Sequence, residues 1–226
     1  HQRIDQLVEA NLIGPAAPLA GDAEFLRRVY LDLAGAIPSA ADARAFLDDA
    51  APNKRELLID RLLASPRFPI HMATTFDIMF MERRQDKHVT DAEWRKYLRA
   101  AFEQNKPYDQ LAREILSADG TDAATRPAAK FFLDRDAEPH SSSRDLGRIF
   151  FGMDLQCAQC HDHPLVDHYL QSDYYGLFAF VNRTMLYTDA AAKKSFLAEK
   201  ADGDASFKSV FTGDAGNTRP QLPGGA

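Results

Sequence analysis

Residues 155–164 read LQCAQCHDHP and contain both cysteines of a chain of 226 residues. Cys157, Cys160 and His161 fit the pattern Cys-x-x-Cys-His, the attachment pattern of c-type haem. In that chemistry each thiol forms a thioether with one vinyl group of the porphyrin, and the two intervening residues span the distance between the vinyl groups. The histidine that follows is held beneath the iron as its proximal ligand. The motif therefore indicates one covalent haem c per chain.

Three other interpretations of the two cysteines stay open. A tetrahedral zinc site usually takes two well-separated pairs of ligands, whereas this chain has only two cysteines, and His163 and His168 follow them closely. A thioredoxin-like redox pair follows a strand within a βαβ layout. The plainest alternative is a pair of core cysteines beside a surface histidine. Haem attachment is favoured because the pattern matches it directly and the rest of the chain lacks a βαβ layout.

The segments around the motif have helical periodicity. Val29 and Leu33 belong to an apolar series that stops at Gly35, a residue that commonly ends helices because it tolerates positive φ. Thr90 and Glu93 form a reciprocal capping pair ahead of another apolar face. Helices are expected within 23–35, 39–49, 52–66, 90–105, 107–120, 141–155 and 171–184. The sequence thus predicts an all-α fold, a single multi-helix domain of roughly eight helices around the haem.

The composition changes near residue 188. From there onward apolar residues are fewer, and Ala, Lys, Asp and Gly are frequent. We therefore expect residues 1–187 to form a helical c-type cytochrome-like domain. Residues 188–226 are expected to be a less ordered C-terminal extension and a linker to a following domain. The FKSVF stretch at 207–211 is the part of this extension best suited to dock onto the core.

The charge and hydropathy of the chain exclude two classes of partner. The net charge is −6, and no lysine- or arginine-rich run supplies the positive surface that nucleic-acid binding needs. No apolar stretch approaches the roughly 20 residues of a membrane span. The opening stretch HQRIDQLVEANL has neither the basic nor the apolar region of a signal peptide, so we expect any export signal to lie outside this segment.

Four stretches of the chain carry a resemblance to a known family. They are FLRRVYLDLAGAIPSAADARAFL, KRELLIDRLLASPRF, NKPYDQLAREILSADG and LQCAQCHDHPLVDHYLQSDYYGLFAF. Together they resemble the cytochrome c-like domain of planctomycete cell-surface and periplasmic proteins, a family formerly catalogued as a domain of unknown function. The motifs run from about Glu24 to Phe180 in matching order. The resemblance implies haem, an exported location in the periplasm or at the cell surface, and a further domain downstream.

The sixth iron ligand is open between several candidates. His88 lies in a polar loop where a histidine has no packing reason to be, and we name it as the first candidate. Met185 is the only methionine after the motif and follows the chain order of small soluble cytochromes. Met81, Met153 and His140 are weaker candidates, because methionines on apolar helical faces are more often core residues. An iron with an open sixth position is the remaining alternative.

Three functions follow from these interpretations. The first is an electron-transfer module that passes single electrons to a redox partner domain or protein. The second is a haem enzyme, or a sensor of gas or peroxide, with an open iron site. The third is a zinc-stabilised helical interaction domain. Electron transfer is favoured because the sequence has no recognisable distal pair of His and Arg suited to peroxide cleavage.

Overall fold

A computed structural model describes residues 2–224 of the chain. It is mainly helical, with about 51% of residues in helices. Within the described range there are ten α-helices, two short 3-10 helices and four strands. The chain divides into two compact units after His71. This division falls inside helix α5, which comprises Arg67–Met81.

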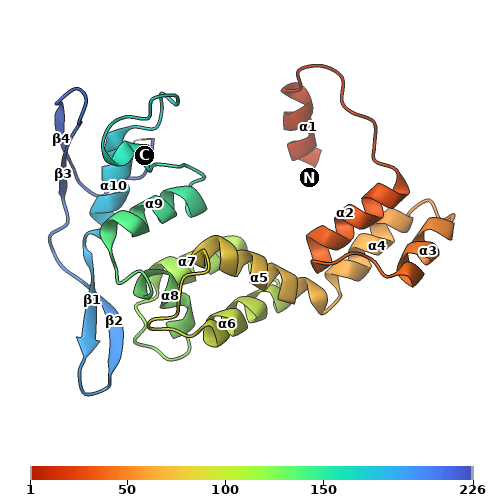
Figure 1. The fold of residues 1–226 in the computed structure, drawn as a ribbon, viewed down its shortest axis with the longest axis horizontal. Helices are drawn as coiled ribbons and strands as arrows, with labels where there is room; N and C mark the ends of the chain where they lie inside the picture. Colours follow the sequence, from red (N-terminus) through yellow and green to blue (C-terminus); the bar gives the residue numbers. More distant parts are fainter. Residues whose placement is uncertain (1, 225–226) are drawn as a thin grey trace. The chain divides into compact units, whose positions relative to one another are not determined.

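The first unit is built on three helices that share a small apolar core (Figure 1). They are α2 (Asp22–Ala34), α3 (Ala40–Asp48) and α4 (Lys54–Leu63). Helix α2 is capped at its C-terminal end by Gly35, whose φ of 64° is in the left-handed region. Helix α3 is capped at its N-terminal end by Ser39, whose hydroxyl accepts a hydrogen bond from the amide of Asp42 at 3.1 Å. Both helix boundaries agree with the sequence prediction. The core consists of Leu26, Tyr30, Ala34, Phe46, Leu58 and Leu62.

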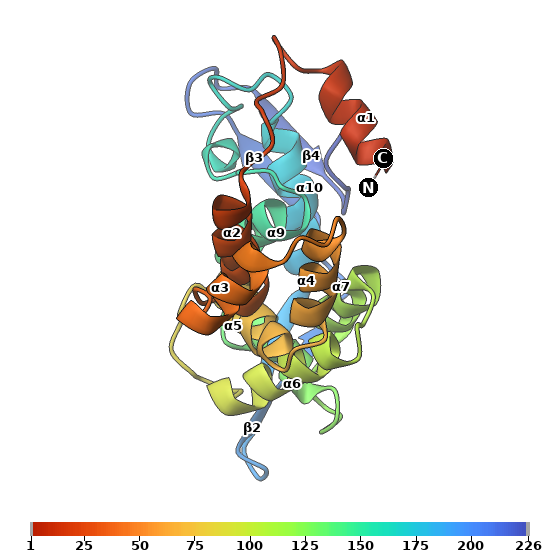
Figure 2. The ribbon, with the colours of Figure 1, turned by 90° about the vertical axis from the view of Figure 1, so that its right-hand side faces the viewer.

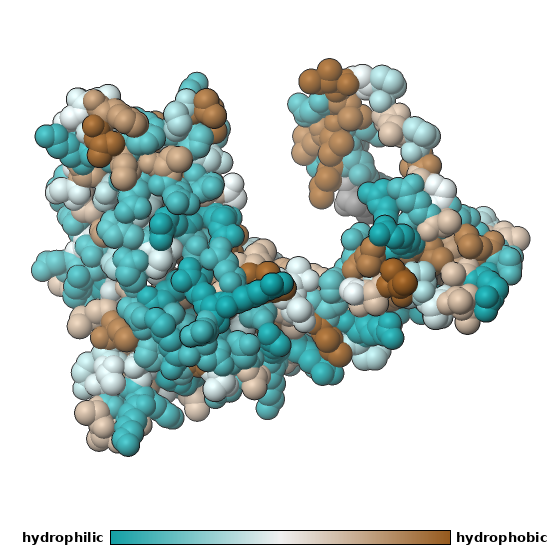
Figure 3. Space-filling model, viewed as in Figure 1, coloured by the Kyte–Doolittle hydropathy of each residue, from teal (hydrophilic) through white to brown (hydrophobic). Residues whose placement is uncertain are grey.

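The N-terminal helix α1 (Gln2–Ala10) contributes no buried residue. Its apolar side chains Ile4, Leu7 and Val8 are each at least half exposed, at 65%, 50% and 55%. Figure 3 shows the resulting apolar surface over this helix in brown. Helix α1 therefore adds apolar surface to the protein without adding to its core.

The second unit contains the larger helical core. Its remaining helices are α6 (Asp91–Glu103), α7 (Tyr108–Ser117), η1 (Arg126–Ala129), α8 (Lys130–Leu133), α9 (Pro139–Phe150), η2 (Cys157–Gln159) and α10 (Gln171–Val181). Helix α6 starts with the predicted capping box between Thr90 and Glu93. Its apolar face buries Trp94 and Leu98 completely, against the equally buried Phe80 and Phe131. Burial of these large side chains is the main stabilising contribution to this unit.

Two β-hairpins follow α10 and depart from the all-α prediction. Strand β1 (Thr184–Asp189) pairs antiparallel with β2 (Lys194–Glu199), and β3 (Ala205–Lys208) pairs antiparallel with β4 (Ala215–Thr218). Both ribbon views show β3 and β4 beside α10 (Figures 1 and 2). Strands of four to six residues carry too few alternating positions to give a clear periodic signal, so sequence periodicity missed them.

The FKSVF stretch docks as its apolar residues suggest. The ring of Phe207 stacks on Tyr175 of α10, with centroids 4.9 Å apart and an interplanar angle of 16°. Phe207 also lies opposite Gly216 in the hairpin register, where its ring occupies the space that a side chain would fill. The predicted domain boundary between residues 187 and 188 stays a prediction, and β1 runs across that position.

Helix length and apolarity give one further result. Within residues 2–224, no helix combines the length and the apolarity that a membrane span requires.

Candidate functional site

The motif forms a single 3-10 turn on the surface, which we call the cysteine turn (Cys157–His161). The amides of Cys160 and His161 both donate to the carbonyl of Cys157, at 3.2 and 3.3 Å. Both thiols are free and exposed. In a 3-10 helix, side chains three residues apart lie on the same side, so the turn presents both thiols from one face.

The imidazole of His161 is oriented by the next residue. Its Nδ1 lies 2.7 Å from the carbonyl oxygen of Asp162. A carbonyl oxygen only accepts hydrogen bonds, so Nδ1 carries the proton, and Nε2 holds the lone pair in the neutral ring. A histidine that ligates a metal commonly donates its other ring N–H to a carbonyl or carboxylate in this way. His161 is therefore prepared to act as a ligand through Nε2.

A small core beneath the cysteine turn fixes it to α10. The fully buried members are Leu155, Ala158, Tyr174 and Leu177. Burial raises the pKa of the Tyr174 phenol, so this group stays neutral and can take part in hydrogen bonding. Its oxygen lies 2.8 Å from Nδ1 of His140. The interior of the turn is therefore apolar with one buried tyrosine hydroxyl.

Gln159, between the two cysteines, is held by two elements. Tyr175 of α10 donates its hydroxyl to the carbonyl of Gln159 at 3.1 Å. The side-chain amide of Gln159 lies 3.2 Å from Nδ1 of His140 in α9. The motif is thus attached both to α9, which precedes it, and to α10, which follows it.

The β3–β4 hairpin meets the cysteine turn from the other side. The amide of Val210 donates to the carbonyl of Cys160 at 3.0 Å, and the ring of Phe211 lies 4.5 Å from that of His161. A cavity of about 400 Å³ lies between the hairpin and the turn. Its lining includes His161, Asp162, Gln171, Phe207, Phe211 and Asp214. The hairpin is thus part of the motif's surroundings, a contribution that composition alone did not reveal.

His88 is held in place by charged residues. Its amide donates to Asp134 at 2.9 Å, and its carbonyl accepts from Arg126 at 3.1 Å. The ring Nε2 lies 3.1 Å from the carboxylate of Asp136. The carboxylate of Asp136 also binds Lys87, which lowers the pKa of Asp136 below its ordinary value. The imidazole of His88 therefore has a carboxylate partner of its own.

Met185 lies in β1, opposite Ala198, and its side chain is 45% exposed. In the described chain, no hydrogen bond, ion pair or ring contact joins Met185 or His88 to the cysteine turn. Met81 is buried in the main core, and Met153 packs against the core beneath the turn. Among the five candidates for the sixth ligand, His140 and Met153 are thus the ones with contacts to the turn or its core.

Two arginines near the motif already have acidic partners. Arg148 pairs with Glu82 and Asp145, and Arg183 pairs with Asp204 at 3.2 Å. As planar cations they are suited to bind the carboxylates of a haem. In this structure, each instead makes an ion pair within the protein.

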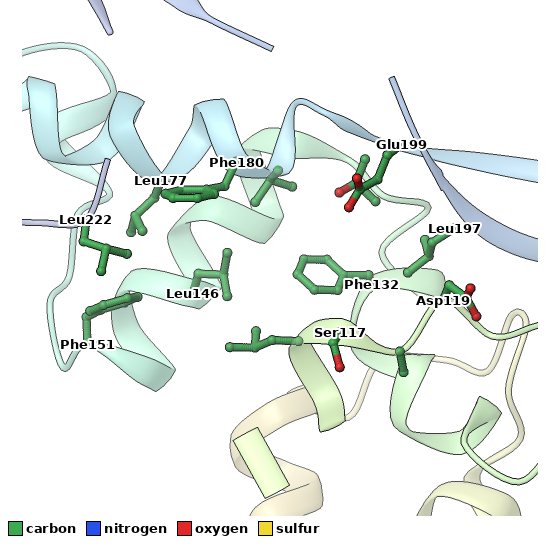
Figure 4. Close-up of a pocket in the computed structure, with 14 residues that line it drawn as sticks. Ser117, Asp119, Phe132, Leu146, Phe151, Leu177, Phe180, Leu197, Glu199 and Leu222 are labelled. Atoms are coloured by element: carbon green, nitrogen blue, oxygen red, sulfur yellow. The ribbon is translucent and has the colours of Figure 1, made fainter. Parts of the chain in front are cut away.

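A second, more apolar cavity of about 450 Å³ lies away from the motif (Figure 4). Leu222, Phe151 and Leu177 lie toward one end of it, and Asp119 and Glu199 toward the other (Figure 4). Its lining, taken from the described residues, includes no cysteine and no histidine. This cavity is therefore separate from the covalent chemistry that the motif indicates.

The structure also reveals a buried ion network that sequence reasoning missed. Lys130 has no exposed side-chain surface, and its ammonium lies 2.5 Å from Asp134 and 2.8 Å from Asp86. Burial alone would lower the pKa of Lys130, but these two hydrogen bonds outweigh it and raise the pKa. The available signal was the pair of opposite charges four residues apart within the apolar run KFFLD.

Within residues 2–224, no group of three or more His, Cys, Asp or Glu side chains is placed to hold a metal ion. The zinc interpretation of the motif therefore gains no support from the arrangement of the described residues.

Comparison with known protein families gives a match over most of the chain. A family model described as PSCyt2, protein of unknown function (DUF1549), matches residues 3–185. The curated proteins and the solved structures gave no significant match. The match supports the resemblance to a planctomycete-type domain family, whereas the cytochrome c character of the chain stays a prediction. Because the matched residues cover most of the sequence, the chain belongs to the PSCyt2 family of proteins of unknown function (DUF1549).

Proposed function

We propose that this chain is a c-type haem-binding domain that acts in electron transfer within a larger exported protein. The observation that carries the proposal is the cysteine turn: two exposed free thiols on one short 3-10 turn, followed directly by a histidine whose Nδ1 donates to a backbone carbonyl. Each of these features matches what covalent attachment and axial ligation require.

The residues of the turn would have separate roles in holding the haem. Cys157 and Cys160 would form the two thioethers, since their thiols are accessible and three residues apart. His161 would bind the iron through Nε2, because Nδ1 is committed to Asp162. Gln159, bound to Tyr175 and close to His140, would keep the distance between the thiols constant. The bound haem would supply a one-electron couple.

The exported location is part of the same proposal. Covalent haem attachment takes place on the outer side of the cytoplasmic membrane, so a domain with this chemistry belongs in the periplasm or at the cell surface. Because both cysteines would be committed to haem, stability would come from the two helical cores and from the haem itself. We propose a downstream domain or a separate redox protein as the electron partner.

A haem enzyme or sensor with an open iron site is a second candidate. One observation favours it: in the described residues, neither His88 nor Met185 contacts the cysteine turn, and the ring of His88 already faces Asp136. An open position would allow a small molecule to bind the iron. The two candidates differ in the spin state of the iron, which can be measured directly.

The proposal is tested by expressing the chain with a cytochrome c maturation system and measuring its haem content after denaturation. We expect one haem that stays bound under denaturing conditions and gives the pyridine haemochrome spectrum of two thioethers. The variants Cys157→Ser and Cys160→Ser should each shift that spectrum toward a single thioether. Wild-type protein that lacks covalent porphyrin, beside a positive control cytochrome that carries it, would refute the proposal.

The sixth ligand is tested on the same preparation with His88→Ala and Met185→Ala. If one residue is the ligand, only its variant converts a low-spin spectrum to a high-spin one. A low-spin spectrum that survives both changes would contradict both of our candidates and direct attention to His140 and Met153. A high-spin spectrum in the wild type would instead favour the open iron site.

A further inference from the structure

We propose that the β3–β4 hairpin forms one wall of the haem site, with Phe211 as the side chain that contacts the macrocycle. This inference rests on the proposed function and names a part of the site that the motif does not include. Residues 205–218 lie beyond the stretch that matches the family model. The wall is thus contributed by a segment outside the family match.

The first step in the argument is that the hairpin is bound to the cysteine turn itself. Val210 donates its amide to Cys160 at 3.0 Å, and the next residue, Phe211, places its ring 4.5 Å from that of His161. Lys208 accepts a hydrogen bond at its carbonyl from the side chain of Gln171, at 3.4 Å. These contacts bring the hairpin to the two residues that would carry a thioether and the axial ligand.

The second step is the exposure of the hairpin's apolar side chains. Phe211 is 77% exposed and Val210 is 65% exposed, although both lie beside the cysteine turn. Large apolar side chains left open to water favour any apolar surface that can cover them. A porphyrin is an apolar plate, and the adjacent thiols would tether it here, which identifies it as the covering group.

The third step is the size and the charge of the cavity between turn and hairpin. Its volume of about 400 Å³ is within the range of roughly 300–1,000 Å³ for ligand pockets. Asp162 and Asp214 line it, and no lysine or arginine does among the described residues. Carboxylates repel the propionates of a haem. Of the cysteine turn, His161 lines the cavity, whereas Cys157 and Cys160 are not among its described lining residues. We therefore expect only the apolar edge of the macrocycle beside His161 to enter it, with the propionates directed elsewhere.

The fourth step is that the hairpin is anchored well enough to act as a wall. Phe207 stacks on Tyr175 of α10 and covers Gly216 of the opposite strand. Downstream of the hairpin, the amide of Gly224 donates to Asp173 at 3.0 Å, also on α10. Phe211 can therefore contact a ligand while the strands that carry it stay in place.

The first experiment compares Phe211→Ala with Phe151→Ala, both in the full chain after haem attachment. Phe151 is a matched control because it is also a partly exposed phenylalanine, at 40%, and lines the other cavity. We expect Phe211→Ala to change the Soret circular dichroism and the reduction potential, and Phe151→Ala to leave both unchanged. Equal spectra and potentials for Phe211→Ala and the wild type would overturn the inference while the proposed function stands.

A second measurement does not depend on any variant. Amide hydrogen exchange of residues 209–214 is compared in the wild-type chain with and without attached haem. Haem that covers the hairpin should slow exchange there by at least about tenfold, with little change at residues 187–194 of the other hairpin. Unchanged exchange at 209–214 in protein that carries covalent haem would overturn the inference. A wild-type chain without haem would instead refute the proposed function on which it rests.

Discussion

Two regions of the second unit carry candidate iron ligands, and they are stabilised in opposite ways. The loop around His88 is held by charged side chains. The carboxylate of Asp134 accepts a hydrogen bond from the backbone amide of His88, and it forms a buried ion pair with Lys130. The cysteine turn is held by local backbone hydrogen bonds and a small apolar core. Its thiols are exposed, whereas the side chain of His88 is only 20% exposed.

This difference suggests what each region is built for. Removing one partner of a buried ion pair is strongly destabilising, because the other charge is left uncompensated in the interior. The backbone of the His88 loop is attached to such a pair, since the amide of His88 donates to Asp134. The cysteine turn leaves its reactive groups accessible, which a covalent attachment step requires. Three substitutions test this difference between the two regions.

The largest effect is expected for Lys130→Met, which removes the buried cation from the His88 region. The carboxylate of Asp134 would then be left without its ion-pair partner in the interior, so the free energy of unfolding should fall by about 3–5 kcal/mol. The raised pKa of Lys130 keeps its ammonium protonated at pH 7. Urea unfolding at pH 7 measures the loss.

Lys96→Met is the control for this prediction, because Lys96 is on the exposed side of α6. We expect Lys96→Met to change the free energy of unfolding by less than about 0.5 kcal/mol. If both lysine substitutions had the same small effect, the charged network would not be what holds the His88 loop.

An intermediate effect is expected for Gly176→Ala. Gly176 lies in α10, the helix on which the cysteine turn packs. A Cβ at this position would lie 2.6 Å from the backbone oxygen of Gln221. The C-terminal segment would have to move away from α10, at a cost of about 1–3 kcal/mol. Thermal unfolding measures the loss. Gly21→Ala, where a Cβ meets no atom within 4 Å, is the control, and equal effects at the two glycines would contradict this packing.

The smallest effect is expected for Glu138→Gln at the start of α9, the helix that positions His140. Glu138 accepts the amides of His140 and Ser141 at 2.9 and 2.7 Å. Burial would raise the pKa of Glu138, but these hydrogen bonds outweigh it and lower the pKa below 4.5. Loss of the charged cap should cost about 1 kcal/mol at pH 7.

The direction of the pKa shift of Glu138 determines how the effect of Glu138→Gln on the free energy of unfolding changes with pH. A lowered pKa in the folded state means that the carboxylate stabilises the fold above about pH 4.5 and loses this effect as the pH falls through the folded-state value. The unfolding free energies of wild type and Glu138→Gln should therefore differ most at neutral pH and converge in acid. A difference that grows toward acid pH would contradict the assignment.

Most of the helical fold could be predicted because its signals are local. The cap at Ser39, the capping box of Thr90 and Glu93, and the left-handed residue Gly35 each act within four residues of the chain. The strands could not be predicted in the same way. Phe207 is stabilised in β3 by Gly216 and Tyr175, residues that are distant in sequence and are brought together only by folding.

In the candidate site, too, the features set by neighbouring residues could be predicted, and the long-range contacts could not. Cys157, Cys160 and His161 match the haem-attachment pattern over five consecutive residues, because the spacing that this pattern requires is set along the chain. The contacts of Gln159 with His140 and of His161 with Phe211 involve separations that no local pattern encodes. The choice of a sixth ligand is of this second kind, and it stays a prediction.

The sequence by itself determined the mainly helical class, the principal helix ends and the chemical pattern of the cysteine turn, since each depends on residues close together in the chain. Only the tertiary structure decided which side chains surround that turn. Burial of Lys130 with Asp134, docking of the β3–β4 hairpin on α10 and the contact of Phe211 with His161 all bring together distant segments. Long-range packing selects such neighbours, because each lowers the free energy only once the rest of the core has formed.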